Sequence, residues 1–111
     1  MELDIKQQVS GDLCELTLVG EVDVYTAPSL KKELVALIEG GCSNVIVDLE
    51  GVAFIDSSGL GVLVSALRRA RERDGAVRIV CSRDSVLKIF RITGLDKVFP
   101  IFQSIAEARE F

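Results

Sequence analysis

A carboxylate and two hydroxyl groups stand next to one another at residues 56–58, within the stretch DSSGLG of residues 56–61. A strongly apolar run at 45–49 leads towards this stretch, and a helical pattern of apolar residues follows it. The pattern places Ser57 and Ser58 near the start of a helix, where backbone N–H groups have no intrahelical partner. Such N–H groups, at the positive end of the helix, favour an anion such as phosphate. The stretch therefore predicts a phosphate or partner site, with modifiable hydroxyl groups next to Asp56.

Two glycines in the first turns of the same helix indicate a close approach by another molecule. Gly59 and Gly61 each cost about 1 kcal/mol there relative to alanine, and they leave room for a second backbone. Leu60 and Val62 project to different sides of a helix, so we expect one of them to be left exposed. These features favour a docking surface. An ordinary helix cap built from aspartate and serine stays open as the alternative.

Most routes to a conventional active site are closed. The chain has no histidine, which excludes a Ser–His–Asp arrangement and imidazole metal ligands. The phosphate-loop pattern Gly-x-x-x-x-Gly-Lys does not occur. Gly59 and Gly61 begin a dinucleotide-binding pattern, but Val64 occupies the position of its third glycine. We therefore predict no catalytic residue, no metal site and no cofactor, and a protein that is not an enzyme.

Length, composition and charge limit the classes of function that remain possible. The 111 residues predict a single domain over 1–111, and 49% hydrophobic residues suffice for a core. The net charge is −4, and Glu72 interrupts the arginine run at 68–73, so this run is read as a solvated helix face and nucleic acid is not expected. No apolar run approaches the roughly 20 residues that span a bilayer, and the first 20 residues do not resemble a signal peptide. We expect a cytoplasmic protein without membrane insertion.

The three cysteines are Cys14, Cys42 and Cys81, and they are widely spaced with no C-x-x-C pattern. In a reducing compartment, disulfides are rare and a cysteine behaves as a small hydrophobic residue. The sequence therefore predicts three buried thiols without a chemical role.

Strand and helix patterns alternate along most of the chain. Strands are expected at 3–9 and 13–19, as a hairpin around Gly11-Asp12, and at 45–49, 77–81 and 98–102. Helices are expected between Thr26 and Gly40, from Ser58 to about residue 74, from 84 or 85 to 94, and after 104. The order β-β-α-β-α-β-α-β-α predicts an α/β fold, with the strands from residue 45 onward roughly parallel and the helices over one face or end.

The stretch 54–63 (FIDSSGLGVL) resembles the signature of bacterial anti-sigma factor antagonists, the single-domain members of the STAS family. Further segments are similar to other parts of that family, and the resemblance covers nearly the whole chain. They are the loop GEVD at 20–23, the central strand VIVDL at 45–49, and ITGL at 92–95 followed by Val98-Phe99. The resemblance implies the STAS fold: a mixed four- to five-stranded sheet with an N-terminal hairpin and about four helices, mainly on one face.

The same resemblance implies a function and a set of partners. The unphosphorylated protein would bind an anti-sigma factor that is also a serine kinase of the GHKL ATPase type, and so release the sigma factor. The kinase would phosphorylate Ser57, with Ser58 as the runner-up, and a PP2C-type phosphatase would restore the antagonist. ATP and magnesium would belong to the kinase, and the free protein would be a monomer. The implied partner-binding residues are Glu21, Asp23, Thr26, Asp56, Ser58, Gly59, Leu60 and Gly61.

Two other interpretations stay open at this stage. The chain is also compatible with a STAS regulatory subunit of a transporter or a larger sensory complex, whose membrane part would be a separate protein. Taken without the resemblance, Glu21 and Asp23 are typical of solvated loop acids.

Overall fold

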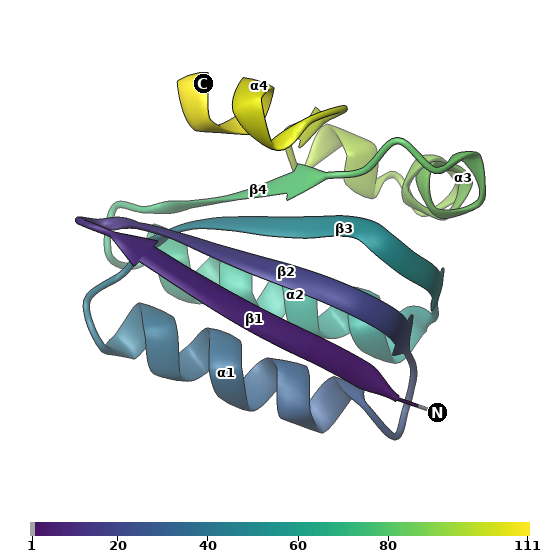
Figure 1. Cartoon of the computed structure of the whole chain (residues 1–111), viewed down its shortest axis with the longest axis horizontal. Coiled ribbons are helices and arrows are strands. Elements are labelled where there is room, and N and C mark those ends of the chain that lie inside the picture. Colours follow the sequence, from purple (N-terminus) through teal and green to yellow (C-terminus); the bar gives the residue numbers. More distant parts are fainter. Residues whose placement is uncertain (1) are drawn as a thin grey trace.

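The sheet has five strands, and their order in space, β1-β2-β3-β4-β5, is the order of the sequence. A computed structural model describes residues 2–111 (Figure 1). β1 and β2 form the predicted antiparallel hairpin, and the pairs β2–β3, β3–β4 and β4–β5 are parallel. The strands are β1 (Leu3–Ser10), β2 (Leu13–Val22), β3 (Asn44–Ile55), β4 (Ala76–Val80) and β5 (Ile101–Phe102).

Helices connect the parallel strands and cover the sheet. They are α1 (Ala27–Glu39), α2 (Ser57–Arg71), α3 (Asp84–Ile92) and α4 (Ile105–Glu110), with a short 3-10 turn, η1 (Leu95–Lys97). α1 and α2 pack side by side under one face of the sheet, and α4 lies over the opposite face (Figure 1). Apolar residues of α1, α2 and α3 join one large cluster. The predicted mixed sheet with a hairpin and four helices is therefore confirmed.

β3 is apolar on both of its faces because both faces are covered. Val45 and Val47 contribute to the large cluster, whereas Ile46 joins a smaller cluster with Val80 and Ala108 of α4. A strand that is buried on both sides is expected to be almost continuously apolar. This explains why the run at 45–49 contains so few polar residues.

Two strand boundaries differ from the prediction. β3 continues from the predicted 45–49 to Ile55, because it stays paired with β2 through two register shifts near Val19 and Glu21. The extended piece expected at 98–102 is a strand only at its last two residues, since the chain first forms η1. Gly94 has a φ of 75°, in the left-handed region, and this turns the chain between α3 and η1.

The expectation that Leu60 or Val62 would be exposed is wrong. Both side chains are buried in the large cluster. The reason is that α2 packs against the sheet and against α1 at the same time. A helix with two neighbours buries a wider arc of its surface than the single stripe assumed from the sequence.

The prediction that all three cysteines are buried thiols without a chemical role also needs correction. All three are buried as predicted, but Cys14 and Cys42 form a disulfide with a Cα–Cα distance of 6.2 Å. Cys14 lies at the start of β2, and Cys42 precedes β3, the parallel neighbour of β2. Strand pairing therefore brings together two residues that stand 28 positions apart. Cys81, at the end of β4, is a buried free thiol.

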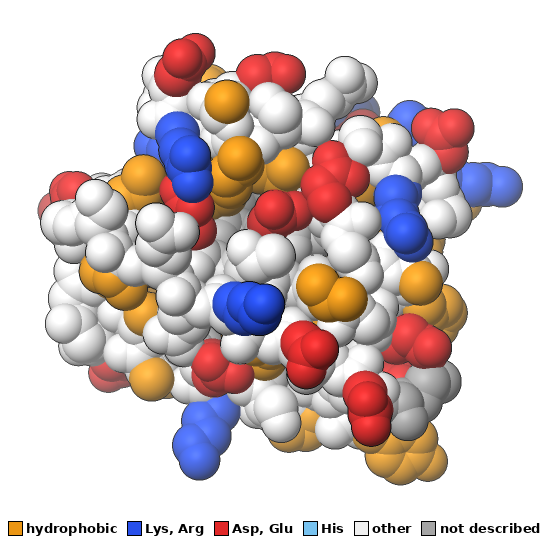
Figure 2. All heavy atoms as spheres, in the orientation of Figure 1, with side chains coloured by type: hydrophobic (Ala, Val, Ile, Leu, Met, Phe, Trp, Pro, Cys, Tyr) orange, Lys and Arg blue, Asp and Glu red, His pale blue; other side chains and the backbone are white. Residues whose placement is uncertain are grey.

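The described part of the chain, residues 2–111, contains no helix that is long and apolar enough to cross a membrane. On the face drawn in Figure 2, acidic and basic side chains are interspersed over the surface. This mixture agrees with the modest net charge of −4.

Candidate functional site

The predicted site residues meet at one edge of the sheet, where β2 and β3 end (Figure 1). Val22 and Ile55 are paired at the ends of these strands, and the N–H of Asp56 donates to the carbonyl oxygen of Val22 at 3.1 Å. The loop 23–26 leaves β2 at this edge, and α2 leaves β3 beside it. Because parallel neighbours end at the same edge, two segments that are about 30 residues apart form one surface.

Asp56 begins α2 as its N-cap residue. Its Oδ1 accepts hydrogen bonds from the backbone N–H of Ser58 at 2.9 Å and of Gly59 at 3.2 Å, and from the Ser58 hydroxyl at 2.7 Å. The Ser58 hydroxyl, together with these two N–H groups, lowers the pKa of the Asp56 carboxyl below its usual value. The N–H groups that the sequence suggested for a phosphate are thus already occupied by a carboxylate of the chain.

The two serines have different surroundings. Ser57 is exposed, and its hydroxyl makes no hydrogen bond to any residue of the described range 2–111. Ser58 is half-buried, and its hydroxyl donates to Asp56. Ser57 is therefore the more accessible acceptor for a modifying enzyme, and the Ser58 hydroxyl is committed to the helix cap.

The loop after β2 is held by its own side chains. Asp23 is only 4% exposed, and its Oδ1 accepts hydrogen bonds from the N–H groups of Tyr25 at 2.9 Å and Thr26 at 3.0 Å. The hydroxyl of Thr26 donates to the carbonyl oxygen of Glu21 at 2.8 Å and accepts from the Asp23 N–H at 2.9 Å. Asp23 is therefore not a solvated acid. Thr26 is the N-cap residue of α1, but its side chain closes the loop and makes no capping hydrogen bond to the helix.

The two glycines of α2 have different surroundings. A Cβ atom at Gly59 would lie 2.5 Å from Cγ1 of Val22 and 2.8 Å from Cγ1 of Ile55. Gly59 is therefore required where α2 crosses the ends of β2 and β3. Gly61 is exposed, and no atom of the described chain lies within 4 Å of the position that its Cβ would take. Of the two, only Gly61 leaves free space on the outside of the molecule.

Exposed apolar side chains that sequence reasoning missed adjoin this site. Tyr25 is 81% exposed, and Val24 next to it is also exposed. Phe54 is exposed at the end of β3, where it pairs with Glu21. The signal in the sequence was a Val-Tyr pair between the two polar residues of a tight turn. Leu60 is buried within the chain and offers a partner little surface.

No group of three or more His, Cys, Asp or Glu side chains within residues 2–111 is placed to hold a metal ion. The site contains the exposed Ser57 hydroxyl, the Asp56 carboxylate that caps α2 and has a lowered pKa, and exposed apolar side chains. This combination suits modification by, and contact with, another protein.

Comparison with known proteins gives consistent results. The STAS domain model matches residues 4–108. The anti-sigma-B factor antagonist of Staphylococcus aureus is 35% identical over 95 residues, which cover 86% of this chain and 88% of that protein. The anti-sigma factor antagonist from Mycobacterium paratuberculosis superposes with a TM-score of 0.90 at 24% identity, over 98% of this chain and 92% of that one. SpoIIAA of Bacillus in its phosphorylated form gives a TM-score of 0.75 at 21% identity, over 98% and 97% of the two chains.

Proposed function

The chain belongs to the STAS domain family, and from this premise we propose that it is an anti-sigma factor antagonist switched by phosphorylation of Ser57. In its unphosphorylated form it binds an anti-sigma factor that is also a serine kinase of the GHKL ATPase type. This binding releases the sigma factor. Phosphorylation of Ser57 ends the interaction, and a PP2C-type phosphatase restores it. The protein acts in the cytoplasm as a binding partner, is a monomer when free, and is a substrate of the kinase.

The observation that carries the proposal is the difference between the two serine hydroxyl groups. Ser57 is exposed at the first position of α2, whereas the Ser58 hydroxyl donates to Asp56 at 2.7 Å. A kinase needs a hydroxyl oxygen that can approach the γ-phosphate of ATP in line. Ser57 meets this need without breaking any hydrogen bond of the folded domain.

The switch follows from charge at a contact surface. A phosphate on Ser57 brings about −1.5 to −2 charges at neutral pH. Asp56 already occupies the nearest N–H groups of α2, so the phosphate stays at the surface beside another negative charge. A partner that covers this surface would have to remove water from the phosphate, which is costly without a compensating cation. Phosphorylation is compatible with this fold, since SpoIIAA has the same fold and was solved in a phosphorylated form.

The unmodified surface offers contacts of two kinds. Tyr25 and Phe54 are exposed, and aromatic side chains of this kind anchor many protein interfaces. Gly61 leaves free space on the outside of α2. Glu21 and Asp56 are the carboxylates that a basic group of the kinase would meet. Asp23 and Thr26 act from inside the loop, by fixing the backbone that presents Tyr25.

The test is incubation of the protein with its cognate kinase and ATP, followed by phosphopeptide mapping. We expect a single label on Ser57. Ser57→Ala should abolish labelling and keep binding to the kinase, and Ser57→Asp should weaken binding. Ser58→Ala is the matched control, because it removes a hydroxyl of the same helix turn and should still be labelled on Ser57.

The proposal fails if the label is found only on Ser58 or on neither serine. It also fails if affinity capture from native lysate recovers a transporter ATPase in place of a small kinase. That second result would favour the role of a regulatory subunit.

A further inference from the structure

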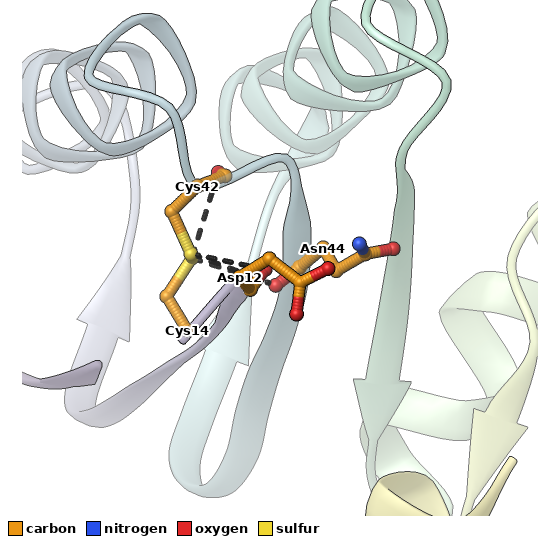
Figure 3. Close-up of a disulfide and its surroundings, with 4 residues drawn as sticks. All are labelled: Asp12, Cys14, Cys42 and Asn44. Carbon is orange, nitrogen blue, oxygen red and sulfur yellow. Dashed lines mark hydrogen bonds between the residues drawn. A yellow bond between two sulfur atoms is a disulfide. The ribbon is translucent and has the colours of Figure 1, made fainter. Parts of the chain in front are cut away.

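Figure 3 shows the disulfide between Cys14 and Cys42. It lies where β2 and β3 begin, whereas Ser57 follows the end of β3. Cys14 is the second residue of β2, and Cys42 stands two residues before β3. The pairing of Leu13 with Asn44 places the starts of the two strands side by side. The bond therefore joins the beginnings of the same two strands whose far ends carry the candidate site.

The surroundings of the two sulfur atoms suit the reduced state as well as the oxidised one. The Sγ of Cys14 lies 3.5 Å from the carbonyl oxygen of Asn44, and the Sγ of Cys42 lies 3.4 Å from that of Asp12 (Figure 3). A thiol is a weak hydrogen-bond donor, so each sulfur has an acceptor ready when the bond is open. The 6.2 Å between the Cα atoms lies within the range of ordinary disulfides. Neither state requires the backbone to be rebuilt.

We propose that Cys14 and Cys42 are a site of reversible oxidative modification, which is a dithiol in a reducing compartment and a disulfide under oxidation. Glutathione and thioredoxin keep most thiols of the cytoplasm reduced. The bridged form would therefore appear when small-molecule disulfides accumulate. The proposal does not depend on phosphorylation of Ser57.

The chemical step is thiol–disulfide exchange with a small disulfide, RSSR. Cys42 is 7% exposed and Cys14 is fully buried, so Cys42 is the sulfur that a reagent reaches. Its thiolate attacks one sulfur of RSSR, which forms a mixed disulfide and expels RS⁻. The thiolate of Cys14 then attacks the Cys42 sulfur and expels the second RS⁻. Both expelled thiolates take up the protons that the cysteines lost, so two cysteine thiols are oxidised and RSSR is reduced to 2 RSH.

The disulfide restricts one segment of the chain, residues 14–42. It closes a loop that contains β2, the turn at 23–26 and α1. A covalent loop restricts the unfolded chain, so oxidation should oppose opening of this segment. We expect the surface around Ser57 to be the same in both redox states, because the bridge lies at the other end of the strands.

Cys81 provides an internal control. It is fully buried, and burial raises the pKa of its thiol. A thiol with a raised pKa forms little thiolate at neutral pH and exchanges slowly. Cys81 should therefore stay reduced while the other two cysteines react with each other.

The experiment equilibrates the full chain in mixtures of reduced and oxidised glutathione, quenches with acid, unfolds the protein and alkylates it with iodoacetamide. Intact mass should show three alkylated cysteines in reducing mixtures and one in oxidising mixtures, with a single transition between them. Peptide mapping should place the remaining alkyl group on Cys81. Thermal unfolding should show a fall in Tm on reduction, on the order of 10 °C for a loop of this length.

Variants separate the bridge from general effects on folding. Cys42→Ser should remove the dependence of Tm on the glutathione ratio, and Cys81→Ala should keep it. The proposal is overturned if the wild-type chain carries three alkyl groups in every mixture. It is also overturned if oxidation yields only glutathione adducts, or if Cys81 takes part in the bond. The wild-type alkylation pattern decides the matter even if a variant does not fold.

Discussion

At the scale of single residues, Asp56 does most to shape the site. Its carboxylate caps α2 and takes the two N–H groups that would otherwise attract an anion. Its pKa is lowered by the Ser58 hydroxyl first and by these N–H groups next. The carboxylate is therefore part of the folded structure as well as part of the proposed contact surface. Substitutions at Asp56 must be judged by stability before they are judged by binding.

We expect the contribution of Asp56 to stability to depend on pH. Its pKa is lower in the folded chain than in the unfolded chain, so its ionised form stabilises the fold above the unfolded value, about 4. This stabilisation is lost as the pH falls through the folded value. Urea unfolding of wild type and Asp56→Asn should differ most near pH 7, and the difference should vanish in acid. A difference that stayed constant from pH 7 to pH 2 would contradict this.

Removal of the Asp56 side chain, and with it the helix cap, should lower the free energy of unfolding. Asp56→Ala should lower the free energy of unfolding by about 1 kcal/mol at neutral pH, the usual effect of losing an aspartate N-cap. Ser58→Ala is the matched control, since it leaves both N–H contacts in place and should cost less. The measurement is the same urea titration, and a larger loss for Ser58→Ala than for Asp56→Ala would overturn the assignment.

The two glycines should respond in opposite directions to the same substitution. Gly59→Ala places a methyl group 2.5 Å from Val22, and overpacking of this kind costs about 1–3 kcal/mol. Gly61→Ala meets no atom within 4 Å and gains helix propensity, so it should stabilise the chain by up to about 1 kcal/mol. Thermal unfolding compares the two variants directly. Equal shifts in Tm would contradict the packing described for Gly59.

From the sequence, the residues of the candidate site could be proposed, but not the surroundings of their side chains. The stretch 56–61 could be located because its residue types are unusual for the start of a helix. The burial of Asp23 could not be predicted, since it depends on a loop that folds over its own side chain. The exposure of Phe54 depends on the register shifts between β2 and β3, which no local pattern encodes.

At the scale of the elements, α3 packs into the large cluster through Val86 and Phe90. Phe90 is fully buried and meets Phe99 edge to face, with ring centroids 6.2 Å apart. Phe90→Ala should lower the free energy of unfolding by about 3–5 kcal/mol, because it leaves a cavity that neighbouring side chains fill only in part. Ile92→Ala, on an exposed position of the same helix, is the matched control and should change stability little. Chemical denaturation measures both.

α4 is attached by few contacts, and its role should be structural only. Arg109 binds Glu15 of β2, with Nη2 and Oε1 2.8 Å apart, and Arg78 donates to the carbonyl oxygen of Ala108 at 3.1 Å. Arg109→Ala should change the free energy of unfolding only slightly, because the arginine side chain is 48% exposed and water screens the ion pair. Truncation after Gln103 should cost more, because it uncovers Ile46 on the sheet.

The truncated chain tests the division between the two clusters. It should still unfold in one cooperative transition and should still be phosphorylated on Ser57, since the large cluster and the candidate site lie apart from α4. Circular dichroism and phosphopeptide mapping follow these two properties. Loss of labelling in a chain that remains folded would show that α4 takes part in recognition.

At the scale of the whole molecule, the class of fold was readable from the alternation of strands and helices. The hairpin, the parallel strands and the ends of most helices were predicted from turn residues and apolar periodicity. The disulfide was not, because the meeting of Cys14 and Cys42 depends on which strands are neighbours. The burial of both Leu60 and Val62 likewise depends on α1 as a second neighbour of α2.

Phosphorylation should change the surface and leave the fold intact. Ser57 is exposed, and no buried contact has to open to accept the phosphate. Amide chemical shifts of the phosphorylated chain should therefore move near 23–26 and 54–61 and stay in place elsewhere, with only a small change in Tm. Widespread shift changes across β4 and α3 would contradict a switch that works at the contact surface.

The order of the strands also bears on how the protein is made. A ribosome releases the chain from its N-terminus, and here every new strand joins the edge that was completed just before it. No strand has to wait for a later one to fill a place at its side, because each strand pairs with the one that precedes it in the chain. Both segments of the candidate site have been synthesised once translation reaches Gly61. The residues that follow complete α2 and add the elements from β4 to α4.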